Sequence, residues 1–171
     1  MAARVRVIVI TGSMGAGKTT VLGEASDLLA KDGIAHAAID LDALAISHLP
    51  GSASPGDLAH ANLRSVWTNY AAAGATRLLV AAAMENSVEL DRVKSAIPNA
   101  EIVVCRLRAP LETMMARVRL REPGMHQERF VARVAELERL LDAAALEGFA
   151  LTNTGSVTDV ARRMLVKSGW L

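Results

Sequence analysis

The chain is poor in features that define several common protein classes. It has one cysteine in 171 residues, so an internal disulfide is excluded, and the apolar run around Cys105 predicts a buried strand position in a reduced protein. Neither sign of charge dominates, because 19 basic and 18 acidic side chains give a formal net charge of +1. No polybasic stretch therefore points to nucleic acid or a membrane surface as a partner.

Long apolar runs are also missing. No segment reaches the roughly 18 unbroken apolar residues that span a bilayer. The apolar run after Met1–Arg4 is short and passes directly into a glycine-rich loop, unlike a cleavable signal peptide. His36, His48 and His60 have no metal-ligand spacing to one another or to Cys105, so a metal site made of protein side chains alone is not expected. We expect a soluble, cytoplasmic protein with a small-molecule partner.

Short apolar runs alternate with segments of helical period, and this pattern predicts an α/β fold with a mostly parallel sheet. Because 51% of the residues are hydrophobic, one domain over residues 1–171 has enough apolar material for its core. The expected strands are 5–11, 34–40, 76–82, 101–107 and 149–152. The expected helices are 18–31, 57–73, 87–96, one with Pro110 in its first turn, one from after Gly124 to about 146, and 157–167. Residues 48–57, rich in Pro and Gly, are expected to form a mobile loop.

A glycine-rich loop follows the first expected strand. It matches the pattern G-x-x-x-x-G-K-[ST], in which backbone N–H groups curl around phosphate oxygens. Lys18 is predicted to contact the β- and γ-phosphates of a nucleoside triphosphate, and the Thr19 hydroxyl to bind Mg²⁺. The predicted nucleotide-binding residues here are Gly12, Ser13, Met14, Gly15, Ala16, Gly17, Lys18, Thr19 and Thr20.

Two acids stand at the carboxyl end of the second expected strand, the edge where ligands bind in open α/β sheets. Asp40 and Asp42 are two residues apart, so an extended chain points both to the same side. One would order a Mg²⁺ water while the other accepts the proton of an attacking hydroxyl. The alternative is that either acid only caps a helix starting at about Ala43. Glu85 is a further acid candidate, although it equally suits a helix start.

Two arginines precede the Pro-Gly break at 123–124. Arg117 and Arg121 are four residues apart on one helical face, and such a pair can clamp a transferring phosphoryl group from a lid over about 117–127. A solvated charged face that includes Arg119 is the alternative. Arg106 and Arg108 share a strand face and either contribute to the site or lead out into solvent.

Four other residues admit two interpretations each. Trp67 and Tyr70 are three apart on a helix and form either an aromatic wall for a substrate or part of the packing against the sheet. Asn153 either meets the nucleotide base or forms a turn. His126 either touches substrate or is a surface loop histidine.

Taken with these residues, nearly the whole chain resembles the small P-loop kinases that phosphorylate metabolites or antibiotics, such as gluconate, shikimate, adenylylsulfate and chloramphenicol kinases. It is similar also to bacterial ATP-binding proteins of less defined role. The resemblance rests on the phosphate loop, on Asp40-Leu41-Asp42, which looks like the acid motif of the group, and on the pair Arg117 and Arg121. It departs from the group at residues 50–64, which match no acceptor-binding motif, and at the third strand, which ends without a Walker-B aspartate.

The resemblance implies a five-stranded parallel sheet ordered 2-3-1-4-5 and an adenine site near Arg117 and Asn153. It implies ATP and Mg²⁺ as cofactors, Asp42 as base or acceptor ligand, and Asp40 as support for the metal through water. The function expected is transfer of the γ-phosphoryl group to a hydroxyl of a small molecule, held beneath a mobile segment at about 48–70, by a monomer or homodimer. The alternatives are an ATP-dependent switch or assembly module, which would bind a protein partner, and a nucleoside or nucleotide kinase.

Overall fold

The structure is a computed structural model that describes residues 4–51 and 54–171, and its centre is a parallel sheet. In the described part of the chain the sheet has five strands in the order β2-β3-β1-β4-β5, every neighbouring pair parallel. This confirms the predicted fold class and strand order. The strands are β1 (Val5–Thr11), β2 (Ala37–Asp40), β3 (Arg77–Ala81), β4 (Ala100–Arg108) and β5 (Phe149–Thr152).

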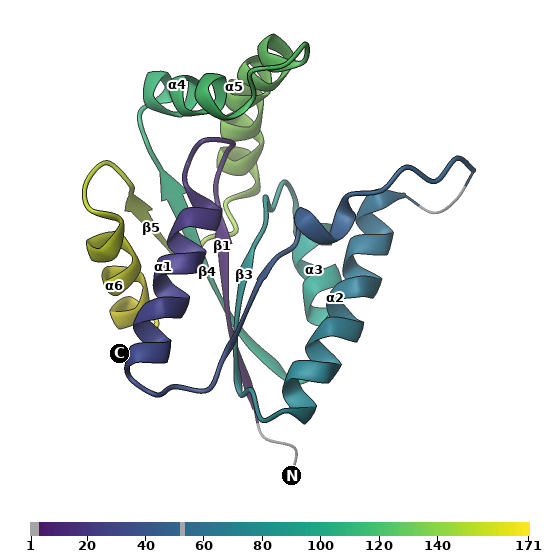
Figure 1. Ribbon diagram of the computed structural model, residues 1–171, viewed down its shortest axis with the longest axis vertical. Coiled ribbons are helices and arrows are strands. Elements are labelled where there is room, and N and C mark those ends of the chain that lie inside the picture. Colours follow the sequence, from purple (N-terminus) through teal and green to yellow (C-terminus); the bar gives the residue numbers. More distant parts are fainter. Residues whose placement is uncertain (1–3, 52–53) are drawn as a thin grey trace.

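Helices cover both faces of this sheet (Figure 1). Helices α1 and α6 pack together on one face and α2 and α3 on the other, while α4 and α5 form an arm at the upper end of the sheet in this view. The helices are α1 (Lys18–Lys31), α2 (Pro55–Ala72), α3 (Ser87–Ala96), α4 (Leu111–Arg121), α5 (Gln127–Ala144) and α6 (Val157–Lys167), with a short 3-10 helix η1 (Ala43–Ala45) after β2. No helix in the described residues is long and apolar enough to cross a membrane.

The sheet separates two apolar clusters. β1 is its central strand, and Ile8 and Ile10 face the cluster beneath α1, α5 and α6, whereas Val7 and Val9 face the cluster beneath α2 and α3. All four side chains are essentially inaccessible to solvent. A β-branched strand that is apolar on both faces suits this position, because both of its faces are covered by helices.

Several element ends differ from the predicted ones by one to three residues. β2 begins at Ala37 rather than at 34, because the Ile34 N–H donates to Leu29 O at 2.9 Å and so completes the end of α1. α2 begins at Pro55 rather than at 57, because the Ser54 side chain accepts a hydrogen bond from the Asp57 N–H and caps the helix. Pro110 is the N-cap of α4 and not part of its first turn.

The predicted loop at 48–57 is therefore shorter than expected, since its last three residues belong to α2. Residues 52 and 53 of that loop, like residues 1–3 at the start of the sequence, lie outside the described residues. At the other end of the chain, α5 stops at Ala144, two residues before the expected end, where Ala145 adopts a left-handed conformation with φ of 46°. The carboxyl ends of β1, β2 and β3 lie side by side at the end of the sheet where α4 and α5 form the arm.

Candidate active site

The loop between β1 and α1 is closely surrounded by neighbouring backbone. Gly15 has φ of 76° and Gly17 has φ of 94°, a left-handed region that disfavours residues with a Cβ. A Cβ on Gly15 would also collide with the Met114 carbonyl oxygen of α4, and one on Gly17 with the side-chain nitrogen of Asn153. The glycines that the sequence motif requires are thus fixed here by the close approach of α4 and of the segment after β5.

Three polar contacts hold this loop in place. The Ser13 hydroxyl donates to Val134 O of α5 at 2.8 Å, and the Asn153 side-chain nitrogen donates to Ala16 O at 2.8 Å. Arg117 joins both regions, because its guanidinium donates to Gly15 O and to Asn153 O, each at 3.1 Å. The loop therefore has a prearranged backbone, which is what a phosphate cradle needs.

Lys18 lies at the start of α1 with its ammonium group folded onto the loop. Its Nζ donates to Gly12 O at 2.9 Å and to Ser13 O at 3.2 Å. Burial lowers the pKa of Lys18, and the negative charges of Asp42 and Asp40 act against that change. The two carboxylates favour the charged form of Lys18, whose ammonium lies on the loop where a phosphate is predicted to bind.

The two acids after β2 have different surroundings. The Thr19 hydroxyl donates to Asp40 Oδ2 at 2.6 Å, while Asp40 Oδ1 accepts from the Asp42 N–H at 3.1 Å. Asp42 stands at the N-cap of η1 but its side chain makes no capping hydrogen bond. The capping alternative therefore does not describe Asp42, whereas Asp40 is tied both to the turn and to the loop threonine.

Asp42 is exposed to solvent in the pocket, and neighbouring protein atoms also surround part of its carboxyl group. This partial burial raises the pKa of its carboxyl group, and the nearby Lys18 ammonium opposes the rise. A carboxylate with a raised pKa is a better proton acceptor than an ordinary aspartate. Thr19 and Asp40 offer oxygen atoms that suit Mg²⁺, directly and through water, and Mg²⁺ commonly takes only one or two protein ligands beside phosphates.

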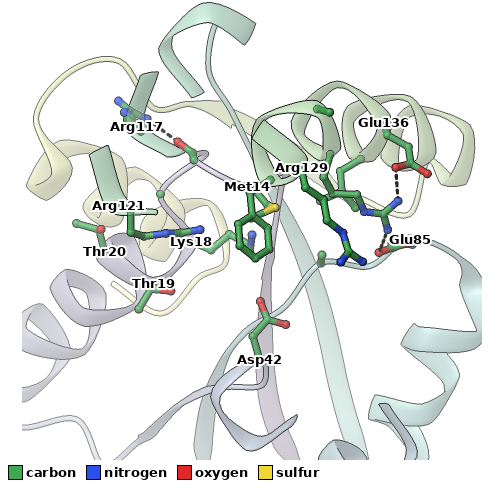
Figure 2. A pocket seen from close by; sticks show the side chains of 17 residues that line it. Met14, Lys18, Thr19, Thr20, Asp42, Glu85, Arg117, Arg121, Arg129 and Glu136 are labelled. Carbon is green, nitrogen blue, oxygen red and sulfur yellow. Dashed lines mark hydrogen bonds and ion pairs between the residues drawn. The ribbon is translucent and has the colours of Figure 1, made fainter. Parts of the chain in front are cut away.

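A pocket of about 1160 Å³ brings the loop and Asp42 together with the arm of α4 and α5 (Figure 2). The loop and the start of α1 form one side of it, and α5 with Glu85 forms the other side. The lining residues are Met14, Gly15, Gly17, Lys18, Thr19, Thr20, Asp42, Ala83, Glu85, Arg117, Arg121, Arg129, Phe130, Ala132, Arg133, Glu136 and Leu137.

The two predicted lid arginines do different things in this structure. Arg121 extends toward Thr20 and Lys18, and its Nε donates to Glu122 Oε1 at 3.0 Å (Figure 2). Arg117 points away from Lys18 and holds backbone carbonyls of the loop. Only Arg121 is directed at the place predicted for the phosphates, so the joint clamp is not formed here. Asn153 is 4% exposed and absent from the pocket wall, so in this structure its side chain supports the loop, and contact with a base stays a prediction.

The segment predicted to cover the acceptor lies apart from this pocket, and its role stays a prediction. None of the described residues between 48 and 70 lines the pocket, whose far wall is α5. Trp67 is buried in the core beneath α2, as the packing interpretation predicted, and Tyr70 is exposed outside the pocket. The aromatic wall therefore does not form. His126 is an exposed N-cap residue of α5 and is not in the pocket wall.

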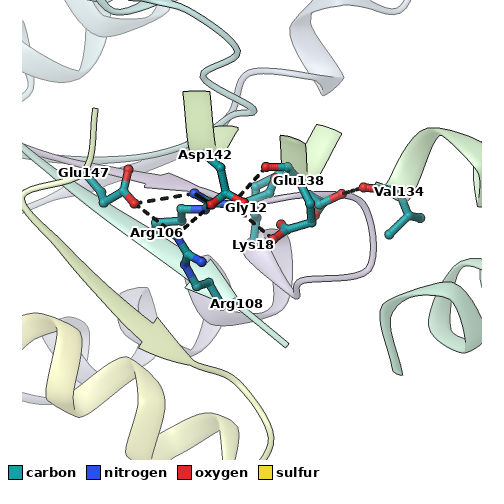
Figure 3. A network of polar contacts seen from close by, with 9 residues as sticks. Gly12, Lys18, Arg106, Arg108, Val134, Glu138, Asp142 and Glu147 are labelled. Carbon is teal, nitrogen blue, oxygen red and sulfur yellow. Dashed lines mark hydrogen bonds and ion pairs between the residues drawn. The ribbon is translucent and has the colours of Figure 1, made fainter. Parts of the chain in front are cut away.

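Arg106 and Arg108 neither line the pocket nor simply lead out into solvent, because both bind acidic side chains. Arg106 is 0% exposed and binds Asp142 Oδ1 at 2.8 Å and Glu138 Oε2 at 3.1 Å, both on α5 (Figure 3). Arg108 is partly exposed and shares Asp142 at 3.0 Å. Glu147 accepts from both arginines at longer range. The two side chains attach α5 to β4, and this attachment explains why α5 stands as a wall of the pocket.

Sequence reasoning missed the α5 residues of the site. Arg129, Arg133 and Glu136 face the pocket, and Arg133 binds Glu85 Oε1 at 2.8 Å and Glu136 Oε2 at 2.7 Å. Their spacing of four and three residues was the available signal, because it places them on one face of a helix. Without the contacts between α5 and the sheet, such a stripe cannot be told from a solvated face.

Similar folds are known among solved structures, although no family model and no curated protein sequence matches the chain. The chain is similar to the tunicamycin resistance protein of Deinococcus radiodurans, with a TM-score of 0.69, 18% identity and 98% of each chain covered. It is similar to shikimate kinase from Acinetobacter baumannii in complex with shikimate, with a TM-score of 0.63, 19% identity, and 98% of this chain and 96% of that chain covered. A third is the Mycobacterium tuberculosis APS kinase in complex with AMPPNP and APS, with a TM-score of 0.59, 17% identity, and 97% and 98% covered. The chain has the fold of the small P-loop kinases.

Proposed function

We propose that a protein with this fold and this pocket is an ATP-dependent phosphotransferase that moves the γ-phosphoryl group to a hydroxyl of a small molecule. The observation that carries the proposal is the position of Asp42, which lines the same pocket as Lys18 and Thr19 and makes no capping contact. A carboxylate opposite a phosphate cradle is the arrangement that hydroxyl phosphorylation requires.

In the proposed reaction the loop backbone and Lys18 bind the β- and γ-phosphates, and Arg121 adds positive charge where negative charge develops. Asp42 accepts the proton of the acceptor hydroxyl while the hydroxyl oxygen attacks the γ-phosphorus and ADP leaves. Its raised pKa suits this role. Arg117 positions the loop through its hydrogen bond to Gly15 O.

The Thr19 hydroxyl and Asp40 are the residues that would hold Mg²⁺, Asp40 through a water molecule. Their 2.6 Å hydrogen bond sets both oxygens beside the loop. When bound, the ion neutralises charge on the β- and γ-phosphates. The residues 117–127 and 48–70 are proposed to adjust on ligand binding as lid and flanking segment of a single domain.

The named functions of the similar structures support the proposal, because two of them are kinases of small molecules and one of these was solved with the ATP analogue AMPPNP. The size of the pocket supports it too, since about 1160 Å³ leaves room for an acceptor beside a nucleotide. A soluble protein that acts in the cytoplasm as a monomer or homodimer fits such an activity.

The alternative of a switch or assembly module has one observation in its favour. Leu120 and Met125 are 86% and 92% exposed at the tip of the arm, where a protein partner would find apolar contacts. A polar pocket beside Asp42 favours the kinase. A nucleoside or nucleotide kinase loses the support of Trp67, which is buried outside the pocket.

The proposal is tested by phosphoryl transfer from radiolabelled ATP to a panel of hydroxylated metabolites and antibiotics. Asp42→Asn is expected to lower kcat by about 10²- to 10⁴-fold, the usual contribution of a general base, while the Kd for AMPPNP changes little. Asp27→Asn is the matched control, because Asp27 is exposed on α1 and outside the pocket. Undiminished transfer by Asp42→Asn would refute the assignment of the base.

A further inference from the structure

The acceptor side of the pocket contains two arginines one helical turn apart. Arg129 and Arg133 both line it from α5, with Phe130 between them in sequence and also in the wall. Asp42 lies across the cavity from this helix in Figure 2. Whatever occupies the space between Asp42 and α5 therefore meets two guanidinium groups or their partners.

Arg133 already has protein partners. Its two terminal nitrogens bind Glu85 Oε1 at 2.8 Å and Glu136 Oε2 at 2.7 Å, and these hydrogen bonds raise the pKa of Arg133. Two carboxylates share this one cation, so the group as a whole has an excess of negative charge. Arg133 is thus held in place and does not offer a free positive charge to a ligand.

Arg129 differs from its neighbour. Its side chain is exposed and makes no hydrogen bond or ion pair with another side chain or backbone group in the described ranges 4–51 and 54–171, and Figure 2 shows it extending from α5 into the cavity on the side of Asp42 and Glu85. It lies away from Thr20 and Arg121, which mark the nucleotide side. A guanidinium is a planar donor that matches a carboxylate or phosphate with two parallel hydrogen bonds.

We propose that the phosphoryl acceptor carries an anionic group, a carboxylate or a phosphate ester, which Arg129 binds so that the hydroxyl faces Asp42. The acceptor class is then the hydroxy acids and phosphorylated polyols. Phe130 adds an apolar contact beside the bound group. The inference rests on the proposed function, since it names the substrate class of the same site. A neutral polyol would leave the charge of Arg129 unpaired.

Binding is measured first, because it does not require the natural acceptor. The protein with AMPPNP and Mg²⁺ is titrated with matched pairs, glycerate and glycerol 3-phosphate against glycerol, and gluconate against sorbitol, and the shift in Tm is recorded. The acids are expected to raise Tm and the neutral partners to leave it unchanged, since only a ligand of the folded state stabilises it. The comparison of glycerate with glycerol 3-phosphate shows whether the site binds a carboxylate or a phosphate ester.

Arg129→Gln is expected to weaken binding of the acids by about 10- to 100-fold, and to raise KM for a phosphorylated acid by a similar factor with a smaller change in kcat. The Kd for AMPPNP is expected to stay the same. Arg139→Gln is the matched control, because Arg139 is exposed on the same helix, lies outside the pocket wall and carries the same charge.

Two results overturn the inference and leave the proposed function standing. One is equal Tm shifts for acids and neutral compounds, or none for any acid. The other is an effect of Arg129→Gln no larger than that of Arg139→Gln. If instead Asp42→Asn transfers phosphate as fast as the unaltered protein, the proposed function itself fails, whatever Arg129 does.

Discussion

Among single residues, Asp42 couples the proposed chemistry to stability. Its pKa is raised in the folded state by burial, so the folded protein holds this proton more tightly than the unfolded chain, whose aspartates titrate near pKa ~3.9. The stability from the protonated carboxyl is therefore present below the unfolded pKa and is lost as the pH rises through the higher folded pKa. Asp42→Asn removes this loss.

We accordingly expect Asp42→Asn to raise Tm at pH 7 although it slows transfer, and the gain in Tm to shrink as the pH falls toward ~3.9. Thermal unfolding of both proteins across this pH range measures the effect. The acid limb of kcat/KM should also lie at a higher pH than an ordinary aspartate would give. A lower Tm for Asp42→Asn at pH 7 would contradict the direction of the pKa change.

Substitutions at two glycines distinguish the cost of a positive φ from the cost of a steric clash. Gly33 has φ of 67° with nothing near the place of a Cβ, whereas Gly15 has φ of 76° and faces the Met114 carbonyl. Gly33→Ala is expected to cost about 1–2 kcal/mol of unfolding free energy and to keep nucleotide binding. Gly15→Ala is expected to cost more and to lose AMPPNP binding, because α4 must move. Denaturant unfolding and calorimetry measure both, and equal effects would show that the contact with α4 is unimportant.

Among the elements, α5 is attached to β4 most deeply by the buried cation of Arg106. Arg106 is 0% exposed and binds Glu138 and Asp142 of this helix. Arg106→Met leaves Glu138, whose side chain is 19% exposed, without its cation, and we expect it to cost about 3–5 kcal/mol of unfolding free energy. Arg108→Met is the comparison, because Arg108 is 43% exposed and shares Asp142; about 0–1 kcal/mol is expected there. Urea unfolding at pH 7 distinguishes them, and similar costs would mean that α5 is held by its apolar contacts instead.

The sequence predicted the elements and half of the pocket. β-branched runs and helical periods located the strands and helices to within a few residues, and the glycine-rich loop and Asp42 were predicted to lie at one site, where both line the pocket. The α5 side of the pocket was not predicted, because the position of α5 depends on its contacts with Arg106. The sequence places Arg106 on a strand but does not show that Glu138 and Asp142 are its partners. The roles of Arg117 and Asn153 escaped for a similar reason, since both bind backbone carbonyls that have no signature in the sequence.

For the whole molecule, the one cysteine reports global unfolding. Cys105 is fully buried in β4, and burial raises the pKa of its thiol to about 12. The thiolate is the reactive form, so a maleimide at pH 7 is expected to label the chain only after unfolding. Labelling followed by mass spectrometry should slow further with ATP and Mg²⁺, because ligand binding lowers the unfolded fraction. Rapid labelling of the folded protein would reveal local opening at β4.

The contact between Ser13 and α5 uses the carbonyl oxygen of Val134, a group that every amino acid at that position supplies. The pocket-facing side chains of α5 can therefore change without disturbing the loop that we propose to hold the triphosphate. Proteins with this fold could therefore change acceptor through a few substitutions on one helix. A directed-evolution library restricted to positions 129, 130, 133 and 136 would test new acceptors while the proposed phosphate donor stays the same.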